Sequence, residues 1–298
     1  MIIGVPREIK ISENRVGLTE AGVKQLTNEG HTVYVENDAG VGSGISNAQF
    51  ERAGAKILPT KKDVYAKADM IVKVKEPLPD EYDLMKENQI LYTYLHLAAE
   101  PKLTRVLTER KVKAVAYETI TDNAGTLPLL TPMSEVAGRM ATQIGAYYLQ
   151  KDHGGKGILL GGVTGVRRGK VAIIGGGVVG VNAAAMAVGL GAEVISLDVN
   201  RARLEYLDHI FGGRVSTLYS NVGNIEKCVA EADLLVGAVL ITGHKAPTLV
   251  SKAMVQTMAP GSVVVDVAVD QGGCIATCRP TSPTHPTYEA NGGIPHRA

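Results

Sequence analysis

The sequence has 298 residues, enough for two domains that each bury a hydrophobic core. Its 31 Lys and Arg nearly balance its 30 Asp and Glu, and the net charge of +1 gives no electrostatic support for binding to nucleic acid or to an anionic membrane. The apolar runs are too short to span a bilayer, and three cysteines together with the lack of a signal-peptide pattern at residues 1–10 predict a cytoplasmic protein.

Residues 1–130 alternate regularly between strand patterns and helical patterns. The expected strands are residues 1–5, 31–36, 55–58, 70–75, 90–96 and 113–119, and the expected helices are residues 20–29, 46–53, 62–67 and 101–111. A linker bounded by Pro77 and Pro79 follows the fourth strand. Such alternation predicts parallel strands with right-handed crossovers, and ligands bind at the carboxyl ends of such strands. We therefore expect an α/β domain whose site residues directly follow its strands.

A long helix over residues 133–151, opened by Thr131 and Pro132, begins a second domain that we place at residues 131–298. A glycine-rich connector then leads to a strand, a glycine turn, a helix and a second strand that ends in an acid. In order, these are residues 171–174, the glycines Gly175, Gly177 and Gly180, residues 182–190, residues 193–197 and Asp198. This order is typical of a dinucleotide-binding domain of the Rossmann type.

Each part of this pattern has a physical task in dinucleotide binding. Gly175 permits the tight turn, Gly177 lets the backbone approach a pyrophosphate, and Gly180 lets the helix pack closely on the strand. The helix N-terminus offers free N–H groups and a positive dipole end to the phosphates. Asp198 is placed to accept hydrogen bonds from the adenosine ribose diol, and its charge would repel a 2′-phosphate. The pattern therefore favours NAD over NADP, although nearby arginines weaken this preference.

The alternation of helices and strands continues to about residue 270. The expected helices are residues 201–211, 225–230 and a segment within 245–258, and the expected strands are residues 215–218, 233–240 and 262–270. Beyond Cys274 the sequence has no periodicity, and we expect no regular structure there. Cys274 and Cys278 lack a second pair of ligands nearby, so we expect no metal site.

Two basic residues of the first domain are candidates for binding a carboxylate. Arg15 follows the first strand, where its guanidinium can grip a carboxylate with two hydrogen bonds. A solvated loop arginine is the competing interpretation. Lys75 ends the fourth strand, in which Lys73 and Lys75 share one face. An edge strand with a solvated face would explain both lysines equally well.

Two further residues are candidates for proton transfer. His96 ends the fifth strand, and histidine suits acid–base chemistry near neutral pH, although a hydrogen-bonded core histidine fits the same position. Asp270 ends the last apolar strand, where we expect it beside a bound cofactor. Asp266, inside that strand, is expected to accept hydrogen bonds from loop backbone groups. With Arg15 and Lys75, these residues suit oxidation of an amino or hydroxy acid at Cα, without a metal or an activated nucleophile.

The sequence closely resembles the NAD-dependent L-alanine dehydrogenase family over residues 1 to about 280. The matching stretches are MIIGVPREIK, NRVGLT, KVKEPLP, TYLHLAAEP, AYET, LPLLTPMSEVAGRMA, GKGILLGGV, KVAIIGGGVVG, EADLLVGAVL, KAPTLV and VDVAVDQGG. The resemblance implies two doubly wound α/β domains, a flavodoxin-like substrate domain and a Rossmann NAD-binding domain, with the active site in an interdomain cleft. It also implies a homohexamer.

The same resemblance implies a reaction and its residues. L-alanine, NAD and water give pyruvate, ammonium, NADH and a proton, reversibly. Arg15 and Lys75 match residues that bind pyruvate, His96 matches the catalytic acid/base, and Asp270 matches the second catalytic residue. The glycines Gly175, Gly177 and Gly180 fall on NAD-contacting positions. So do Asp270 and the following residues: Ser134, Val178, Val179, Asp198, Arg203, Ser220, Val239, Leu240, Val267, Ala268 and Val269.

Two alternatives remain open. The NAD-binding subunit of proton-translocating transhydrogenase is similar in fold, but it lacks a histidine at the position of His96. The resemblance also loosens after Pro280, and we expect that a segment which encloses the nicotinamide in relatives is absent. A truncated NAD-binding paralogue with weak or no activity is therefore the second alternative.

Overall fold

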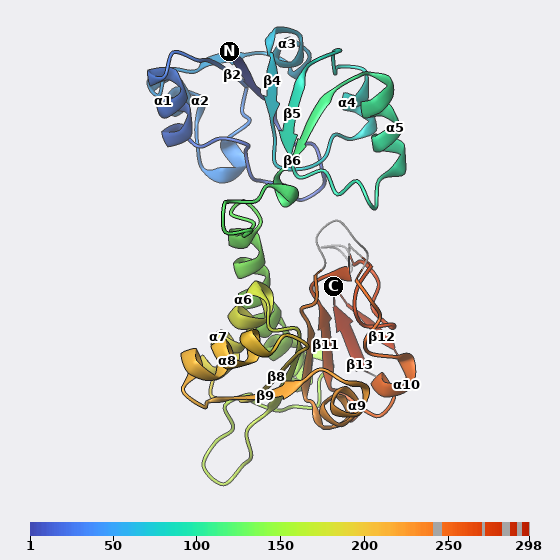
Figure 1. Cartoon of the computed structure of the whole chain (residues 1–298). Helices are drawn as coiled ribbons and strands as arrows, with labels where there is room; N and C mark the ends of the chain where they lie inside the picture. The colour runs from blue at the N-terminus through green and yellow to red at the C-terminus, as the bar shows by residue number, and fades with distance from the viewer. Residues whose placement is uncertain (241–245, 270–271, 282–286, 291–293, 298) are drawn as a thin grey trace. The chain divides into compact units, whose positions relative to one another are not determined.

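The computed structural model of the chain describes residues 1–240, 246–269, 272–281, 287–290 and 294–297 (Figure 1). The chain divides into two compact units, Met1–Leu127 and Pro128–Ala298, which we call unit 1 and unit 2. Each unit contains a sheet that is largely or wholly parallel, with helices between its strands, so the predicted α/β class is confirmed for both. Across the described ranges, no helix has the length and apolar character needed to cross a bilayer.

The sheet of unit 1 is parallel throughout. Its strands are β1 (Ile2–Val5), β2 (Thr32–Glu36), β3 (Lys56–Leu58), β4 (Met70–Val72), β5 (Ile90–Thr93) and β6 (Lys113–Ala116). Their order across the sheet is β3-β2-β1-β4-β5-β6, so the chain winds outward to β3 and then returns to lie beside β1. This is the Rossmann order. The prediction of a flavodoxin-like substrate domain is wrong in the strand order. The flavodoxin-like order is 2-1-3-4-5, in which the direction of winding across the sheet reverses after the second strand rather than after the third.

Helices cover both faces of this sheet. They are α1 (Glu20–Asn28), α2 (Asn47–Arg52), α3 (Lys61–Lys67), α4 (Pro79–Tyr82) and α5 (Pro101–Glu109). Val23 of α1 and Phe50 of α2 belong to one buried core cluster, whereas Val64 of α3 and Leu103 of α5 belong to another. A core on each side of the sheet is what a doubly wound domain requires.

Two local features of unit 1 differ from the sequence-based expectation. β4 and β5 end at Val72 and Thr93, so Lys75 and His96 lie in the loops that follow rather than within the strands. α4 forms where only a linker was expected. Its first residue is Pro79, and proline suits the first helical position because its fixed φ is already helical and its missing N–H is not needed there.

The sheet of unit 2 has the order β12-β13-β11-β10-β7-β8-β9. Its strands are β7 (Lys170–Ile174), β8 (Glu193–Asp198), β9 (Val215–Tyr219), β10 (Leu234–Gly237), β11 (Val263–Asp266), β12 (Tyr288–Ala290) and β13 (Ile294–Arg297). All neighbouring strands pair in parallel except the antiparallel pair of β12 and β13. β12 and β13 contradict the expectation that no regular structure follows Cys274. Strands of three and four residues are too short to show an alternating pattern.

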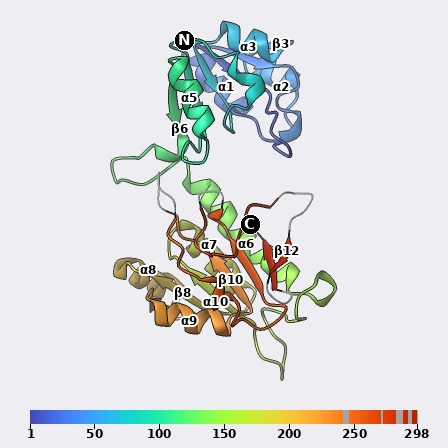
Figure 2. The ribbon, with the colours of Figure 1, turned by 90° about the vertical axis from the view of Figure 1, so that its right-hand side faces the viewer.

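The main helices of unit 2 are α6 (Thr131–Tyr148), α7 (Val178–Gly189), α8 (Arg201–Phe211), α9 (Val222–Glu231) and α10 (Lys252–Val255). α6 runs beside α7 (Figure 2). A Cβ added at Gly138 would lie 2.2 Å from the carbonyl oxygen of Val179, so this glycine lets the two helix backbones touch. α7 begins directly after Gly177, earlier than the predicted helix at residue 182, and this brings its N-terminus to the glycine turn.

Candidate functional site

Arg15 lies in the loop between β1 and α1, and Glu13 holds its guanidinium. The Nε of Arg15 lies 2.8 Å from Oε1 of Glu13, and Nη2 lies 2.5 Å from Oε2. The backbone N–H of Arg15 also donates to this carboxylate, at 2.9 Å. Burial alone would raise the pKa of Glu13, but these hydrogen bonds and the charge of Arg15 outweigh burial and lower the pKa. Arg15 is thus an oriented cation rather than a freely solvated loop arginine.

Arg15 lines a pocket of about 500 Å³, a volume suited to a small molecule. The pocket is formed by loops that follow β1 and β2, at the carboxyl end of the sheet. Its lining residues are Arg7, Glu8, Glu13, Asn14, Arg15, Asp38, Ala39, Val41 and Gly42. Glu8 is buried there, and burial raises its pKa although the charge of Lys73 opposes the rise. The pocket therefore presents both cationic and acidic groups to a ligand.

Lys75 follows β4 and is half-buried, and its charge helps to lower the pKa of Glu13. Lys73, two residues earlier, has a side chain that is only 1% exposed. Its Nζ lies 2.7 Å from both carboxylate oxygens of Glu81 and 3.6 Å from Oε2 of Glu8. β4 lies between β1 and β5, so it is not an edge strand. The interpretation of both lysines as one solvated face is therefore wrong, because buried carboxylates compensate the charge of Lys73.

His96 occupies the turn after β5 with a φ of 49°, in the left-handed region that residues other than glycine usually avoid. Its backbone N–H donates to Oε1 of Glu118 at 2.7 Å, and the N–H of Leu95 donates to the same oxygen at 3.1 Å. The ring of His96 is stacked on that of Tyr94, with centroids 6.2 Å apart. Its Nε2 is buried and has no hydrogen-bond partner among the described residues, unlike that of a satisfied core histidine. This nitrogen therefore has a hydrogen-bonding capacity that no described residue uses.

Three residues that the sequence analysis did not single out complete this neighbourhood, namely Glu13, Tyr94 and Glu118. Tyr94 is buried, and its ring is stacked on that of His96 and lies edge-on to the ring of Tyr117, with centroids 4.9 Å apart in the second pair. Burial raises the pKa of Tyr94, and the charge of Arg15 opposes this rise, which places the tyrosine within the influence of the cation. Glu118 lies near the carboxyl end of the predicted strand over residues 113–119, and this position was a usable signal by the same rule that singled out His96.

In unit 2, the glycine turn has the geometry that its spacing predicts. Gly175 has a φ of 105°, a conformation that is open mainly to glycine. A Cβ added at Gly180 would lie 1.9 Å from the carbonyl oxygen of Gly175, so only glycine permits this close approach. A Cβ at Gly177, which precedes α7, would meet no atom within 4 Å. The backbone at the N-terminus of α7 is therefore open to a pyrophosphate, and the residues present fit a dinucleotide.

Asp198 ends β8 and is tied to the glycine turn. Its Oδ2 accepts the N–H of Gly176 at 2.7 Å, and its Oδ1 accepts the N–H of Asn200 at 2.7 Å. A carboxylate oxygen has more than one acceptor site, so both oxygens can still accept from a ribose diol. Arg203 donates from Nε to the carbonyl oxygen of Gly176 at 2.9 Å, and its guanidinium lies over the ring of Tyr206. Arg203 is thus held by the protein itself beside Asp198.

The other residues predicted to contact NAD follow strands of unit 2 or begin its helices. Val178 and Val179 begin α7, Ser220 follows β9, Val239 and Leu240 follow β10, Val267, Ala268 and Val269 follow β11, and Ser134 lies in the first turn of α6. Asp270 lies outside the described residues. Asp266 is fully buried and accepts backbone N–H groups of Ala268, Cys274 and Ile275 at 3.2, 2.8 and 3.0 Å, as predicted.

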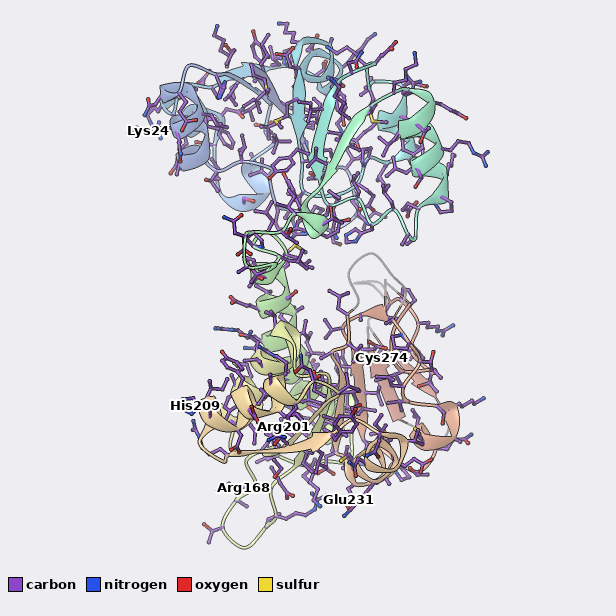
Figure 3. All side chains as sticks on the ribbon, in the orientation of Figure 1. Lys24, Arg168, Arg201, His209, Glu231 and Cys274 are labelled. Carbon is purple, nitrogen blue, oxygen red and sulfur yellow. The ribbon has the colours of Figure 1, made fainter. Side chains whose placement is uncertain are left out.

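The cysteines of unit 2 do not add reactive thiolates to this site. Cys274, labelled in Figure 3, is fully buried, and burial together with the charge of Asp266 raises its pKa to about 12. Burial also raises the pKa of Cys278. In the part of the chain that the structure describes, no group of three or more His, Cys, Asp or Glu is arranged to hold a metal ion.

Known families and proteins match the chain over nearly its whole length. Residues 4–137 match the model of the alanine dehydrogenase/PNT N-terminal domain, and residues 141–296 match that of the C-terminal domain. Alanine dehydrogenase of Bacillus subtilis is 60% identical over 295 residues, which are 99% of this chain and 78% of the relative. Alanine dehydrogenase of Methanococcus maripaludis is 59% identical over 295 residues, which are 99% of this chain and 79% of the relative.

Solved structures extend this comparison to the fold. An L-alanine dehydrogenase superposes with a TM-score of 0.93 and 55% identity, covering all of this chain and 82% of the solved one. A transhydrogenase from Sinorhizobium meliloti superposes with a TM-score of 0.84 and 27% identity, covering all of this chain and 85% of the solved one. In both sequence and structure, the chain is more similar to this alanine dehydrogenase than to this transhydrogenase.

Proposed function

The chain belongs to the alanine dehydrogenase/PNT family, and from this membership we propose that it catalyses the reversible NAD-dependent oxidative deamination of L-alanine to pyruvate and ammonium. In this proposal residues 1–130 form the substrate domain and residues 131–298 the NAD-binding domain. The active protein is a cytoplasmic homohexamer. Its three cysteines, all free of disulfides, are compatible with a reducing compartment.

The observation that carries the proposal is the setting of His96. Its buried Nε2 has no partner among the described residues, and its ring is stacked on that of Tyr94, where the charge of Arg15 opposes the rise in pKa that burial causes. A histidine in such a place is suited to hold and release a proton beside a bound carboxylate. The transhydrogenase alternative is less well supported, because that class lacks a histidine at this position and the solved example is only 27% identical.

The groups of unit 1 carry the acid–base part of the reaction. NAD, if bound in unit 2, would supply the hydride acceptor for Cα of alanine, once the ammonium group of the substrate has released one proton. Arg15 and Lys75 bind the substrate carboxylate, orient Cα and balance the negative charge. Nε2 of His96 takes a proton from the water that adds to the resulting iminium carbon. It returns this proton to the nitrogen, and as the C–N bond breaks the hydroxyl proton passes to the leaving ammonia, which leaves pyruvate and ammonium. Asp270, by family resemblance, positions the water or the ammonium.

The groups of unit 2 hold the cofactor. The open backbone at Gly177 and the N-terminus of α7 take the pyrophosphate, which needs N–H donors and a close backbone approach. Asp198 accepts the ribose hydroxyls, and the other NAD contacts remain as predicted from the resemblance. The cofactor is therefore NAD rather than NADP in this proposal.

The test is the formation of NADH from L-alanine by the purified chain, followed by absorbance, with NADH affinity measured separately by fluorescence. We expect His96→Ala to slow turnover by about 10²- to 10⁴-fold with unchanged NADH affinity. His153→Ala, which alters a histidine of unit 2, is the matched control and should remain active. Equal inactivity of the wild type and His96→Ala, with NADH still bound, would support the alternative of a binding-only paralogue.

A further inference from the structure

Glu118 continues the pairing between β5 and β6 at the point where the strands end. The ladder of these two strands finishes at the pair Thr93 and Ala116. Beyond it, the carboxylate of Glu118 takes the place of backbone carbonyls. Its Oε1 accepts the N–H of Leu95 at 3.1 Å and that of His96 at 2.7 Å, and its Oε2 lies 3.3 Å from the N–H of Leu95. One side chain therefore satisfies two successive backbone donors.

These hydrogen bonds are made at and beside a residue with an unfavourable backbone conformation. His96 has a φ of 49°, and a residue with a Cβ adopts this backbone region only when the surrounding structure holds it there. Hydrogen bonds from N–H groups to a carboxylate are shorter and stronger than those to a neutral acceptor. The contact at 2.7 Å is the shortest of the set, and it is made by His96 itself.

We propose that Glu118 is a positioning residue for His96, which holds the turn after β5 so that the imidazole is correctly placed for proton transfer. The inference rests on the proposed function of His96 as acid/base. The contacts of Glu118 are with backbone N–H groups rather than with the ring, so its role is to supply an acceptor oxygen at a fixed place. It does not require that Glu118 exchange a proton with His96.

The expected signature is a loss of turnover without a loss of substrate affinity. Arg15 and Lys75 bind the carboxylate and do not depend on Glu118 in the contacts described above. A small displacement of an acid/base group costs about a hundredfold in rate. Glu118→Ala should therefore lower kcat about a hundredfold and leave KM for pyruvate and NADH affinity unchanged.

Two conservative variants separate position from charge. Glu118→Gln keeps an acceptor oxygen at the same reach and should retain most of the turnover. Glu118→Asp keeps the charge but withdraws the oxygens by one methylene, and it should be nearly as slow as Glu118→Ala. The opposite order, with Glu118→Asp active and Glu118→Gln slow, would overturn the proposal in favour of a role for the charge. Full activity of Glu118→Ala would also overturn it.

Hydrogen exchange provides a measurement that does not depend on activity. The amides of Leu95 and His96 should exchange faster in Glu118→Ala than in the wild type, whereas Glu109→Ala, a change at an exposed glutamate at the end of α5, should leave them unchanged. If the wild type is inactive while exchange behaves as expected, the proposed function fails but Glu118 still holds the turn. Unchanged exchange in Glu118→Ala overturns the positioning role itself.

Discussion

The Nζ of Lys73 lies 2.7 Å from both carboxylate oxygens of Glu81, and both side chains are buried in the centre of unit 1. Glu8 approaches the same ammonium at 3.6 Å, and Lys61 approaches Glu81 at 3.4 Å. A buried ion pair of this kind is strongly sensitive to the loss of one partner, because the remaining buried charge loses its closest counterion and gains no water in its place. Lys73 lies two residues before Lys75, so the network also anchors the loop whose Lys75 is predicted to bind the substrate.

We predict that Lys73→Met lowers the free energy of unfolding by about 3–5 kcal/mol. The double variant Lys73→Met, Glu81→Leu should lose less stability than the single variant, because it also removes the buried carboxylate of Glu81, which would otherwise lose its closest counterion. Urea unfolding followed by circular dichroism measures these differences. Lys111→Met removes an exposed pair with Glu87 and should cost less than about 1 kcal/mol. Equal effects of Lys73→Met and Lys111→Met would contradict this account.

Lys73 also illustrates which parts of the fold were predictable. The strand–helix alternation predicts parallel sheets correctly, because each parallel connection needs a crossover. It does not predict strand order, which depends on how helices pack on the two faces, and the flavodoxin-like expectation failed for that reason. A strand in the centre of a doubly wound sheet is covered on both faces, so Lys73, which directly follows β4, does not lie on a solvated face.

The glycine turn yields a second prediction, in which two neighbouring glycines behave differently. Gly180→Ala should destabilise unit 2 by about 1–3 kcal/mol or more, because its Cβ would overlap the carbonyl oxygen of Gly175 at 1.9 Å. Gly177→Ala should leave the melting temperature nearly unchanged, since its Cβ meets no protein atom within 4 Å. It should instead weaken NADH binding, because the added methyl group fills the space proposed for the pyrophosphate.

Gly189→Ala is the matched control for both variants. This residue ends α7, and its Cβ would also meet no atom within 4 Å. The change should leave NADH affinity intact and raise stability by up to about 1 kcal/mol, through helix propensity. Thermal unfolding and fluorescence titration with NADH separate the two effects. If Gly177→Ala binds NADH as well as Gly189→Ala does, the pyrophosphate does not lie against Gly177.

Asp198 carries the third prediction, on cofactor choice. Asp198→Asn keeps an acceptor oxygen for the backbone of the turn but removes the negative charge that would repel a 2′-phosphate. We expect NADH affinity to fall about 10- to 100-fold, as for the loss of hydrogen bonds to a charged group, and NADPH affinity to fall less or to rise. Fluorescence titration with NADH and with NADPH gives the ratio of the two affinities. Asp208→Asn on α8 is the control, and an unchanged NADPH/NADH ratio in Asp198→Asn would remove Asp198 from this role.

A residue of the candidate site was predictable only where its type and its position in the sequence were together enough to indicate a role. Arg15 and His96 were found because each follows a strand of a parallel sheet, where ligands bind. Glu118 lies 22 residues from His96, and the two are neighbours only because β5 and β6 pair. Glu13, although close to Arg15 in sequence, gave no signal because carboxylates beside arginines are common in loops. The left-handed φ of His96 is likewise a consequence of tertiary contacts.

The fourth prediction concerns pH and rests on Asp233, which is buried beside the start of β7. Arg167 donates to its two carboxylate oxygens at 2.7 and 3.0 Å, the backbone N–H of Lys170 donates at 2.7 Å, and Lys156 also contacts it. Burial alone would raise the pKa of Asp233, but these donors outweigh it and lower the pKa below the ordinary value of 3.8. The folded state therefore binds fewer protons than the unfolded state in this range.

It follows that the stability contributed by Asp233 is complete above pH 3.8 and is lost as the pH falls through the lower pKa of the folded state. Asp233→Asn should cost about 1–3 kcal/mol at neutral pH, since it weakens charge-assisted hydrogen bonds. The difference from the wild type should stay constant down to about pH 5 and shrink below the ordinary pKa of aspartate. Urea unfolding across this range measures it, with Glu226→Gln, an exposed change on α9, as the reference. A difference that instead grows towards acid would mean that burial dominates and that the pKa of Asp233 is raised.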